Sequence, residues 1–302
     1  MNHSRYNPTD EDWDFLIILD ACRYDYFKEI YRDYLPAGKF EKVLSPASHT
    51  DEWVKKVFSD IYDDIVYISA NPFINSKGIK GFNPKKFFEV IDVWYDGWDE
   101  NCNTVPPDKV NEATLNAVRK YINKRFIIHY MQPHAPYLSL RDLGGGDISA
   151  DRSCRVVGKK IEKIHPKIRD FLDYLYIKQD NLLKRRGIAW KFAQSLGLPP
   201  LDPMDAALRV AGQDGLKQAY KENLREVLKC INLLLQTISG KIIIIADHGE
   251  LLGEGGDYSH RMGYHVPLLI EVPKLELNIK QESKARRIIS KNIQKLKSED
   301  KI

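Results

Sequence analysis

The sequence predicts an α/β fold with a mostly parallel central sheet and helices on both faces. Short apolar runs rich in isoleucine and valine alternate with longer amphipathic stretches along most of the 302 residues, a pattern typical of strands buried between two helical layers. Several of these runs end directly in polar residues, as expected where the strands of a parallel sheet face a ligand. A hydrophobic content of 43% is sufficient for a well-buried core.

Six strands and three helices are expected from these runs. The strands cover residues 15–19, 42–44, 65–69, 126–130, 242–246 and 268–272, and a weaker strand is expected at 90–94. The helices cover residues 51–58, 109–123 and 216–238, and the last of these has the clearest apolar stripe. We expect all of these elements to belong to a single domain over residues 1–302.

Residues 138–215 interrupt this pattern and predict a helical insertion within the domain. They contain a glycine-rich turn, a basic stretch, helical pieces around 171–196 and a proline-rich segment. Because ligands of α/β folds bind beyond the carboxyl ends of the strands, an insertion at this edge could form a lid. The charged tail from residue 280 onward is expected to be a solvated surface helix.

Charge and composition argue against several classes of protein. The net charge of +4 is a mild excess that would help to attract an anionic substrate, and it does not resemble a nucleic-acid footprint. The apolar runs are far too short to span a bilayer, and the first fifteen residues lack the pattern of a secretory signal. Four scattered cysteines without a CxxC pair predict reduced thiols. A cytoplasmic location is therefore expected.

Two of the expected strands lead directly into residues that can bind a metal. Asp20 follows the first strand, although an aspartate at this position is also common as a turn or cap residue. Asp247 and His248 follow the run of four isoleucines and offer one oxygen and one nitrogen side by side, which suits Zn, Mn or a similar divalent ion. A buried structural histidine would not explain this pattern together with His260 twelve positions later.

Two loops carry hydroxyl or imidazole groups that could act on an ester. The segment SPASHT precedes an expected helix, where a metal can activate a hydroxyl and the first-turn amides can hold an anion. Ser48 with Asp51 could equally form a helix N-cap worth about 1 kcal/mol. His134 lies between two prolines, which would fix its direction for protonating a leaving oxygen or binding an anion. His129, inside the preceding strand, is interpreted as structural.

Taken together, these segments resemble the alkaline phosphatase superfamily, and within it the sulfatase-like and phosphoethanolamine or lipoteichoic-acid transferase branches. The resemblance covers most of residues 15–273 and consists of motifs in the same order: a strand with its aspartate, a hydroxyl about thirty residues later, an HxxxPHxPY loop, ADHGE and a downstream histidine. It implies an alkaline phosphatase-like fold and an enzyme that acts on a phosphoric or sulfuric ester of a small molecule.

The resemblance also implies roles for individual residues. The metal ligands would be Asp20, Thr50, Asp247 and His248, with Thr50 as the nucleophile. Thr50 is preferred to Ser48 because the related branches show a threonine shortly before an aromatic residue or a serine on the new helix, as in SHTDEW. The residues that would contact the transferred group or its leaving oxygen are His134 and His260. Ser48 and His49 are further candidate substrate contacts, although His49 has no family counterpart.

Departures from the family pattern narrow these expectations. The CxPSR signature of formylglycine sulfatases is absent, the second adjacent aspartate is Ala21, and no DxxxH pair precedes ADHGE. One divalent ion is therefore expected, with Zn or Mn ahead of Ca or Mg, and His260 and His134 would recruit a second ion only transiently. The expected reaction is hydrolysis of a phosphate or sulfate ester by metal-assisted attack of Thr50, with a covalent intermediate. Transfer to a sugar or lipid head group, or anion binding without catalysis, stay as alternatives.

Overall fold

The computed structural model describes residues 5–143, 186–197, 200 and 202–280. Seven strands form one sheet in the order β2-β9-β6-β1-β5-β3-β4. Strand β9 pairs antiparallel with both of its neighbours, and the other described pairings of this sheet are parallel. The bounds of these strands are β1 Phe15–Leu19, β2 Lys39–Leu44, β3 Tyr62–Ser69, β4 Phe87–Asp92, β5 Arg125–Tyr130, β6 Gly240–Ala246 and β9 Glu271–Ile279. The predicted α/β class with a mostly parallel sheet is confirmed.

Five of the expected strands are confirmed, and four of them begin earlier than predicted. Strand β1 has the predicted bounds, whereas β2, β3, β5 and β6 each extend toward the N-terminus. The added residues are largely polar or glycine, as in Gly240 and Lys241 at the start of β6. Backbone pairing does not require apolar side chains, so the apolar run marks only the buried part of each strand.

Two strand predictions were partly wrong because an apolar run alone does not distinguish a strand from a short buried helix. Residues 267–270 form helix α9 (Pro267–Ile270), and β9 begins only at Glu271. Proline suits the first helical position, since its fixed φ is that of a helix and its missing N–H needs no partner there. Likewise β4 ends at Asp92, and the following apolar residues belong to α3 (Val93–Asp96).

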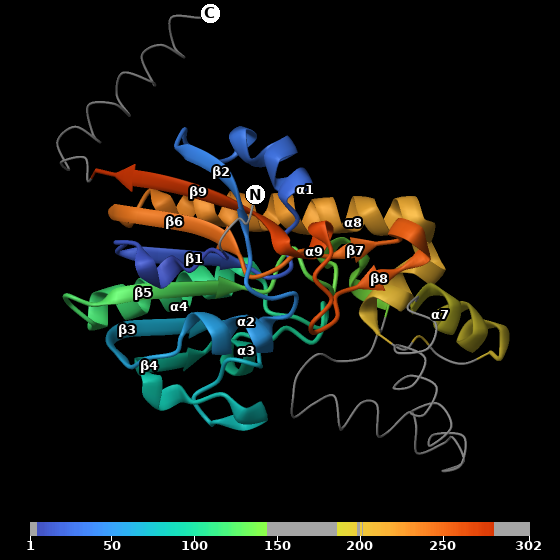
Figure 1. The fold of residues 1–302 in the computed structure, drawn as a ribbon, viewed down its shortest axis with the longest axis horizontal. Coiled ribbons are helices and arrows are strands. Elements are labelled where there is room, and N and C mark those ends of the chain that lie inside the picture. The colour runs from blue at the N-terminus through green and yellow to red at the C-terminus, as the bar shows by residue number, and fades with distance from the viewer. Residues whose placement is uncertain (1–4, 144–185, 198–199, 201, 281–302) are drawn as a thin grey trace, which may run out of the picture.

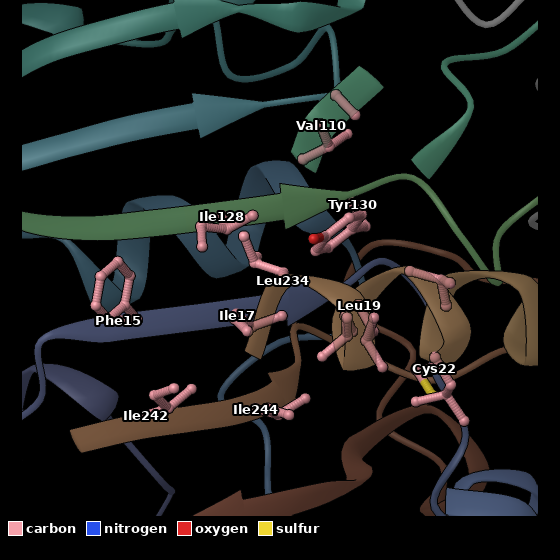
Figure 2. Close-up of a cluster of buried hydrophobic side chains, with 14 of the residues drawn as sticks. Phe15, Ile17, Leu19, Cys22, Val110, Ile128, Tyr130, Leu234, Ile242 and Ile244 are labelled. Carbon is pink, nitrogen blue, oxygen red and sulfur yellow. The ribbon is translucent and has the colours of Figure 1, made fainter. Parts of the chain in front are cut away.

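Helices cover both faces of the sheet (Figure 1). Alternate residues of β1 point to opposite sides. Phe15, Ile17 and Leu19 lie in one buried cluster with residues of α1 (Tyr24–Ile30), α4 (Pro107–Lys120) and α8 (Pro203–Leu235). Figure 2 shows part of this cluster, with Leu234 of α8 beside the side chains of the central strands. Leu16 and Ile18 lie in a second cluster with residues of α2 (Thr50–Val57).

The three predicted helices are present with shifted ends. Helix α2 begins at Thr50, α4 ends at Lys120, and α8 begins at Pro203 rather than at residue 216. Asp202 caps α8 by accepting a hydrogen bond from the amide of Asp205, and Gly212 interrupts the helical backbone with a φ of 68°. Helix α8 therefore starts inside the segment that was predicted as an insertion.

Part of the predicted insertion is described as η5 (Leu138–Leu143), α7 (Arg186–Ser195) and the start of α8. Residues 144–185, 198–199 and 201 of it and the predicted tail helix lie outside the described residues, so the lid and the surface helix stay predictions. Within the described part of the chain, no helix combines the length and the apolar character that crossing a membrane requires. The remaining described elements are β7 (Leu251–Leu252), β8 (Tyr258–Ser259) and the short helices η1 (Pro8–Asp10), η2 (Tyr31–Asp33), η3 (Ile79–Gly81), η4 (Pro84–Lys86) and η6 (Glu254–Gly256).

Candidate active site

Three predicted metal ligands meet at the carboxyl edge of the sheet. Asp20 follows β1, and Asp247 and His248 follow β6, which pairs with β1 so that Leu19 lies opposite Ala246. All three side chains are buried, and one ligand atom from each lies within 4.8 Å of the others. The register of two neighbouring strands therefore joins residues that are more than two hundred positions apart.

The tautomer of His248 is set by its own loop. Its Nδ1 lies 2.9 Å from the carbonyl oxygen of Gly249, and because a carbonyl only accepts hydrogen bonds, Nδ1 carries the proton. The lone pair on Nε2 then faces Asp247 Oδ2 at 3.4 Å and Asp20 Oδ1 at 3.8 Å. This is the orientation that a metal-binding imidazole requires.

One carboxylate oxygen of Asp20 lacks a partner. Oδ2 accepts a hydrogen bond of 2.5 Å from Asn71 Nδ2, whereas the buried Oδ1 has no hydrogen-bond partner among the described residues. Burial raises the pKa of Asp20 well above its ordinary value, and the nearby Asp247 raises it further. A buried charge without a partner is costly. A cation beside Oδ1 would give this oxygen a partner and would offset the repulsion between Asp20 and Asp247. The two carboxylates, the His248 imidazole and the adjacent Thr50 hydroxyl fit a divalent ion.

Asp247 has the opposite electrostatic balance. Burial raises the pKa of its carboxyl group, but the nearby imidazoles of His248 and His129 and the hydrogen bond from Thr50 outweigh this, so the pKa lies below its ordinary value. Its Oδ1 also accepts hydrogen bonds from the amides of Ala21 at 3.1 Å and of His248 at 2.9 Å. Asp247 is thus held in its ionised form by several donors.

Thr50 is the predicted hydroxyl that faces the metal ligands. It is the first residue of α2, and its Oγ1 lies 2.7 Å from Asp247 Oδ2 and 3.2 Å from His248 Nε2. Ser48 is turned away, since its hydroxyl donates to the carbonyl of Arg261 at 2.6 Å and accepts from the amide of Tyr264 at 3.1 Å. The alternative that Ser48 caps the helix was wrong, because His49 is the N-cap residue.

The four predicted histidines form one cluster beside these ligands. The ring centroid of His260 lies 4.3 Å from that of His248, 5.1 Å from that of His134 and 5.4 Å from that of His49. The pKa of His49 and that of His134 are lowered to about 4, mainly because both imidazoles are buried. Burial also lowers the pKa of His260 well below its ordinary value. Near neutral pH the imidazoles of His49, His134 and His260 are therefore uncharged and can accept protons.

Glu250 is a site residue that was not predicted, although it stands in the ADHGE motif. It is fully buried, and its Oε1 lies 2.9 Å from His260 Nδ1. Burial raises its pKa, and Arg186 partly opposes this. When ionised, Glu250 only accepts, so His260 donates from Nδ1 and keeps a lone pair on Nε2. His134, Glu250 and His260 also form a second set whose ligand atoms lie within 4.8 Å of one another, and it could hold a metal.

Two further residues lie near Asp20: Asn71, which was not predicted from the sequence, and His129, which was interpreted as structural. Asn71, which orients Asp20, follows the end of β3 closely, and the same rule of polar residues after apolar runs could have found it. His129, interpreted as structural, donates to or accepts from Tyr67 Oη through Nδ1 at 3.0 Å. Its Nε2 lies 3.7 Å from Asp20 Oδ2 and has no hydrogen-bond partner in the part of the chain that is described, so His129 also borders the metal ligands.

No protein-family model matches this chain, and no curated protein matches it significantly. Among solved structures, integral membrane protein lipooligosaccharide phosphoethanolamine transferase A from Neisseria meningitidis is 13% identical with a TM-score of 0.47, and the match covers 94% of this chain and 50% of that one. The C-terminal periplasmic domain of phosphoethanolamine transferase EptC from Campylobacter jejuni is 14% identical with a TM-score of 0.44 over 87% and 78%. A phosphonate monoester hydrolase from Silicibacter pomeroyi is 13% identical with a TM-score of 0.44 over 88% and 68%.

These similar structures are two phosphoethanolamine transferases and a phosphonate monoester hydrolase. This chain spans half of the length of the first of them. Identities below 15% with TM-scores below 0.5 carry no functional argument, so the case for an activity depends on the residues of this chain.

Proposed function

We propose that this chain is a metal-dependent enzyme that cleaves a phosphate or sulfate ester through a covalent intermediate on Thr50. The observation that carries the proposal is the position of Thr50 Oγ1, within 3.2 Å of both Asp247 Oδ2 and His248 Nε2 at the start of α2. A divalent ion held by Asp20, Asp247 and His248 would lower the pKa of the hydroxyl and neutralise charge on the ester.

In the first half of the reaction, Thr50 Oγ1 forms a bond to phosphorus or sulfur while the bond to the leaving oxygen breaks. The hydroxyl proton leaves toward Asp247 Oδ2, which already accepts its hydrogen bond at 2.7 Å. The N-terminal end of α2 favours the negative charge of the ester oxygens, because helix N-termini carry a partial positive charge. The product of this half is a phosphorylated or sulfated Thr50 and the leaving group, which departs as its anion or takes a proton from an imidazole that was protonated in the preceding turnover.

In the second half, a water or an alcohol attacks the modified Thr50 and must lose a proton. His134 and His260 are uncharged near neutral pH because burial lowers the pKa of both, so either can accept that proton. The proton on Asp247 returns to Thr50 Oγ1 as its bond to phosphorus or sulfur breaks, and the protonated imidazole donates to the leaving oxygen of the next ester. Glu250 holds Nδ1 of His260, which leaves Nε2 as the atom that exchanges the proton.

The test is release of nitrophenol from its phosphate monoester, phosphate diester and sulfate ester, with Zn, Mn, Mg or Ca supplied in turn. Thr50→Ala should lose the turnover. A matched control is Thr114→Ala, because Thr114 is also a buried helical threonine but its hydroxyl bonds only to the carbonyl of Val110 in its own helix. Intact-mass spectrometry of acid-quenched protein should find a covalent adduct in the wild type and none in Thr50→Ala.

The outcomes separate the three functional classes. Full turnover by Thr50→Ala would contradict the proposal. An added alcohol that appears in the product would favour a transferase acting on a sugar or lipid head group. Binding of metal and phosphate with no turnover of any ester would favour a non-catalytic anion-binding protein.

A further inference from the structure

Asn223 is a fully buried polar residue on the apolar face of α8. Its neighbours on that face include Tyr220, Leu224 and Val227, which are also fully buried. A buried amide is costly unless both its donor and its acceptor have partners. The partners of Asn223 therefore indicate what this residue does.

All described hydrogen bonds of the Asn223 side chain go to the loop that carries His134. Its Nδ2 donates to the carbonyl oxygens of His134 at 3.1 Å, Pro136 at 3.0 Å and Pro133 at 3.4 Å, and its Oδ1 accepts from the amide of Leu138 at 2.8 Å. Prolines lack an N–H and cannot continue a regular hydrogen-bond ladder. The side chain of Asn223 supplies hydrogen-bond partners to three carbonyl oxygens and one amide of the loop.

The same loop is tied to the metal ligands on its other side. The amide of His134 donates to the carbonyl oxygen of Asp20 at 3.2 Å. The main chain of His134 is held between Asp20 and Asn223, and its Nδ1 is hydrogen-bonded to the carbonyl oxygen of Ala135. The ring then lies 5.1 Å from that of His260.

We propose that Asn223 is a positioning residue, whose carboxamide fixes the main chain of residues 133–138 and so directs the His134 imidazole toward His260. The inference rests on the proposed function of His134 as a proton-transfer group. Misplacing a reacting group by about 1 Å can cost about a hundredfold in rate. Loss of the carboxamide should therefore slow turnover while the ligands Asp20, Asp247 and His248 stay in place.

The variant is Asn223→Leu, which keeps the size of the side chain and removes its hydrogen bonds. Asn111→Leu is the matched control. Asn111 also lies on a helix, and its side chain donates to the carbonyl of Cys230 at 2.7 Å and accepts from the hydroxyl of Tyr130 at 2.5 Å. Neither of these described bonds goes to the loop that carries His134. If Asn223→Leu does not fold, Asn223→Asp replaces it, since the aspartate still accepts from the amide of Leu138.

We expect Asn223→Leu to lower kcat for the nitrophenyl ester at least tenfold, with KM within about twofold and the metal content per chain unchanged. In a His134→Ala background, the same substitution should have no further effect on kcat. A merely structural role would lower kcat equally in both backgrounds, and that result would overturn the proposal, as would wild-type kcat in Asn223→Leu.

A second readout does not depend on turnover. In protein labelled with ¹⁵N-histidine, the imidazole signals of His134, assigned from their loss in His134→Ala, should shift in Asn223→Leu and stay in place in Asn111→Leu. If no ester is turned over by the wild type, the proposed function fails while this spectrum still tests the positioning. Unchanged His134 signals in Asn223→Leu would overturn the inference.

Discussion

The phenolic oxygen of Tyr220 lies 2.7 Å from the carbonyl oxygen of Ala21, and it also accepts a hydrogen bond of 2.9 Å from the amide of Arg23. Ala21 has a φ of 55°, in the left-handed region that costs a non-glycine residue about 1–2 kcal/mol. Helix α8 thus holds the strained turn that follows Asp20 and presents the Ala21 amide to Asp247 Oδ1. Tyr220 of this helix therefore connects to Asp247, a candidate metal ligand, through the turn at Ala21.

Tyr220→Phe should weaken metal binding. The substitution keeps the buried ring but removes both hydrogen bonds to the turn after Asp20, and loss of such outer partners typically costs 10–100-fold in metal affinity. Competition with a coloured chelator measures the affinity. Tyr130→Phe is the control, since it removes a hydrogen bond to Asn111 from another buried tyrosine. Equal metal affinities of the wild type, Tyr220→Phe and Tyr130→Phe would show that the turn after Asp20 keeps its conformation without Tyr220.

Thr50→Ser should keep measurable turnover, while Thr50→Ala should lose more than about a thousandfold, as expected when a nucleophile is removed. Serine retains the hydroxyl beside Asp247 and His248 but lacks the methyl group that restricts its rotation. Steady-state kinetics with the best nitrophenyl ester checks both variants. Comparable activity of the alanine and serine variants would show that this hydroxyl does not take part.

Glu250→Gln should lower kcat by about two to four orders of magnitude with little loss of metal from the Asp20 set. A glutamine can donate to Nδ1 of His260, which would stabilise the wrong tautomer, as is known for triads in which the orienting carboxylate becomes an amide. Kinetics and metal analysis on the same preparation separate the two effects. Glu254→Gln is the control, because Glu254 pairs with Arg23 and not with a histidine. A Glu250→Gln enzyme with normal kcat would contradict the orienting role.

Lys274→Met should destabilise the fold near neutral pH. Burial lowers the pKa of Lys274, but its hydrogen bonds to Glu11, Glu276 and Glu41 raise that pKa overall, and the pKa of Glu276 is lowered mainly by its bond to Lys274. The lysine contribution is complete below its unfolded pKa of 10.5 and is lost as the pH rises through the folded value. The Glu276 contribution is complete above its unfolded pKa of 4.5 and is lost as the pH falls.

The thermal midpoint of Lys274→Met should therefore lie below that of the wild type between these two pH values, with the difference shrinking on further acidification. Removing charge-assisted hydrogen bonds of this kind typically costs about 1.5–3 kcal/mol each. Lys241→Met, which removes an exposed pair with Asp12, should leave the thermal midpoint nearly unchanged, because exposed ion pairs contribute little to stability. Scanning calorimetry across the pH range checks both. A constant difference down to pH 3 would show that the carboxylates are not involved.

Local patterns in the sequence predicted most of the sheet, because a buried strand must be apolar along its length whatever it packs against. They also predicted that Asp20, Asp247 and His248 meet, since neighbouring parallel strands end at one edge. The prediction failed at residues 268–270, where the first part of an apolar run forms a helical turn before the strand begins at Glu271. The cytoplasmic location and the insertion boundaries stay predictions.

The sequence by itself determined the fold class, the candidate metal ligands that follow strands and the hydroxyl at the start of α2, since each depends on a short run of residues and its immediate end. Only the tertiary structure decided which other polar residues surround the candidate metal ligands and histidines. Glu250 meets His260 through the fold of a loop, Asn71 meets Asp20 through strand order, and Tyr220 and Asn223 reach two loops from one face of α8. Such contacts join residues far apart in sequence through packing and register, which no local pattern records.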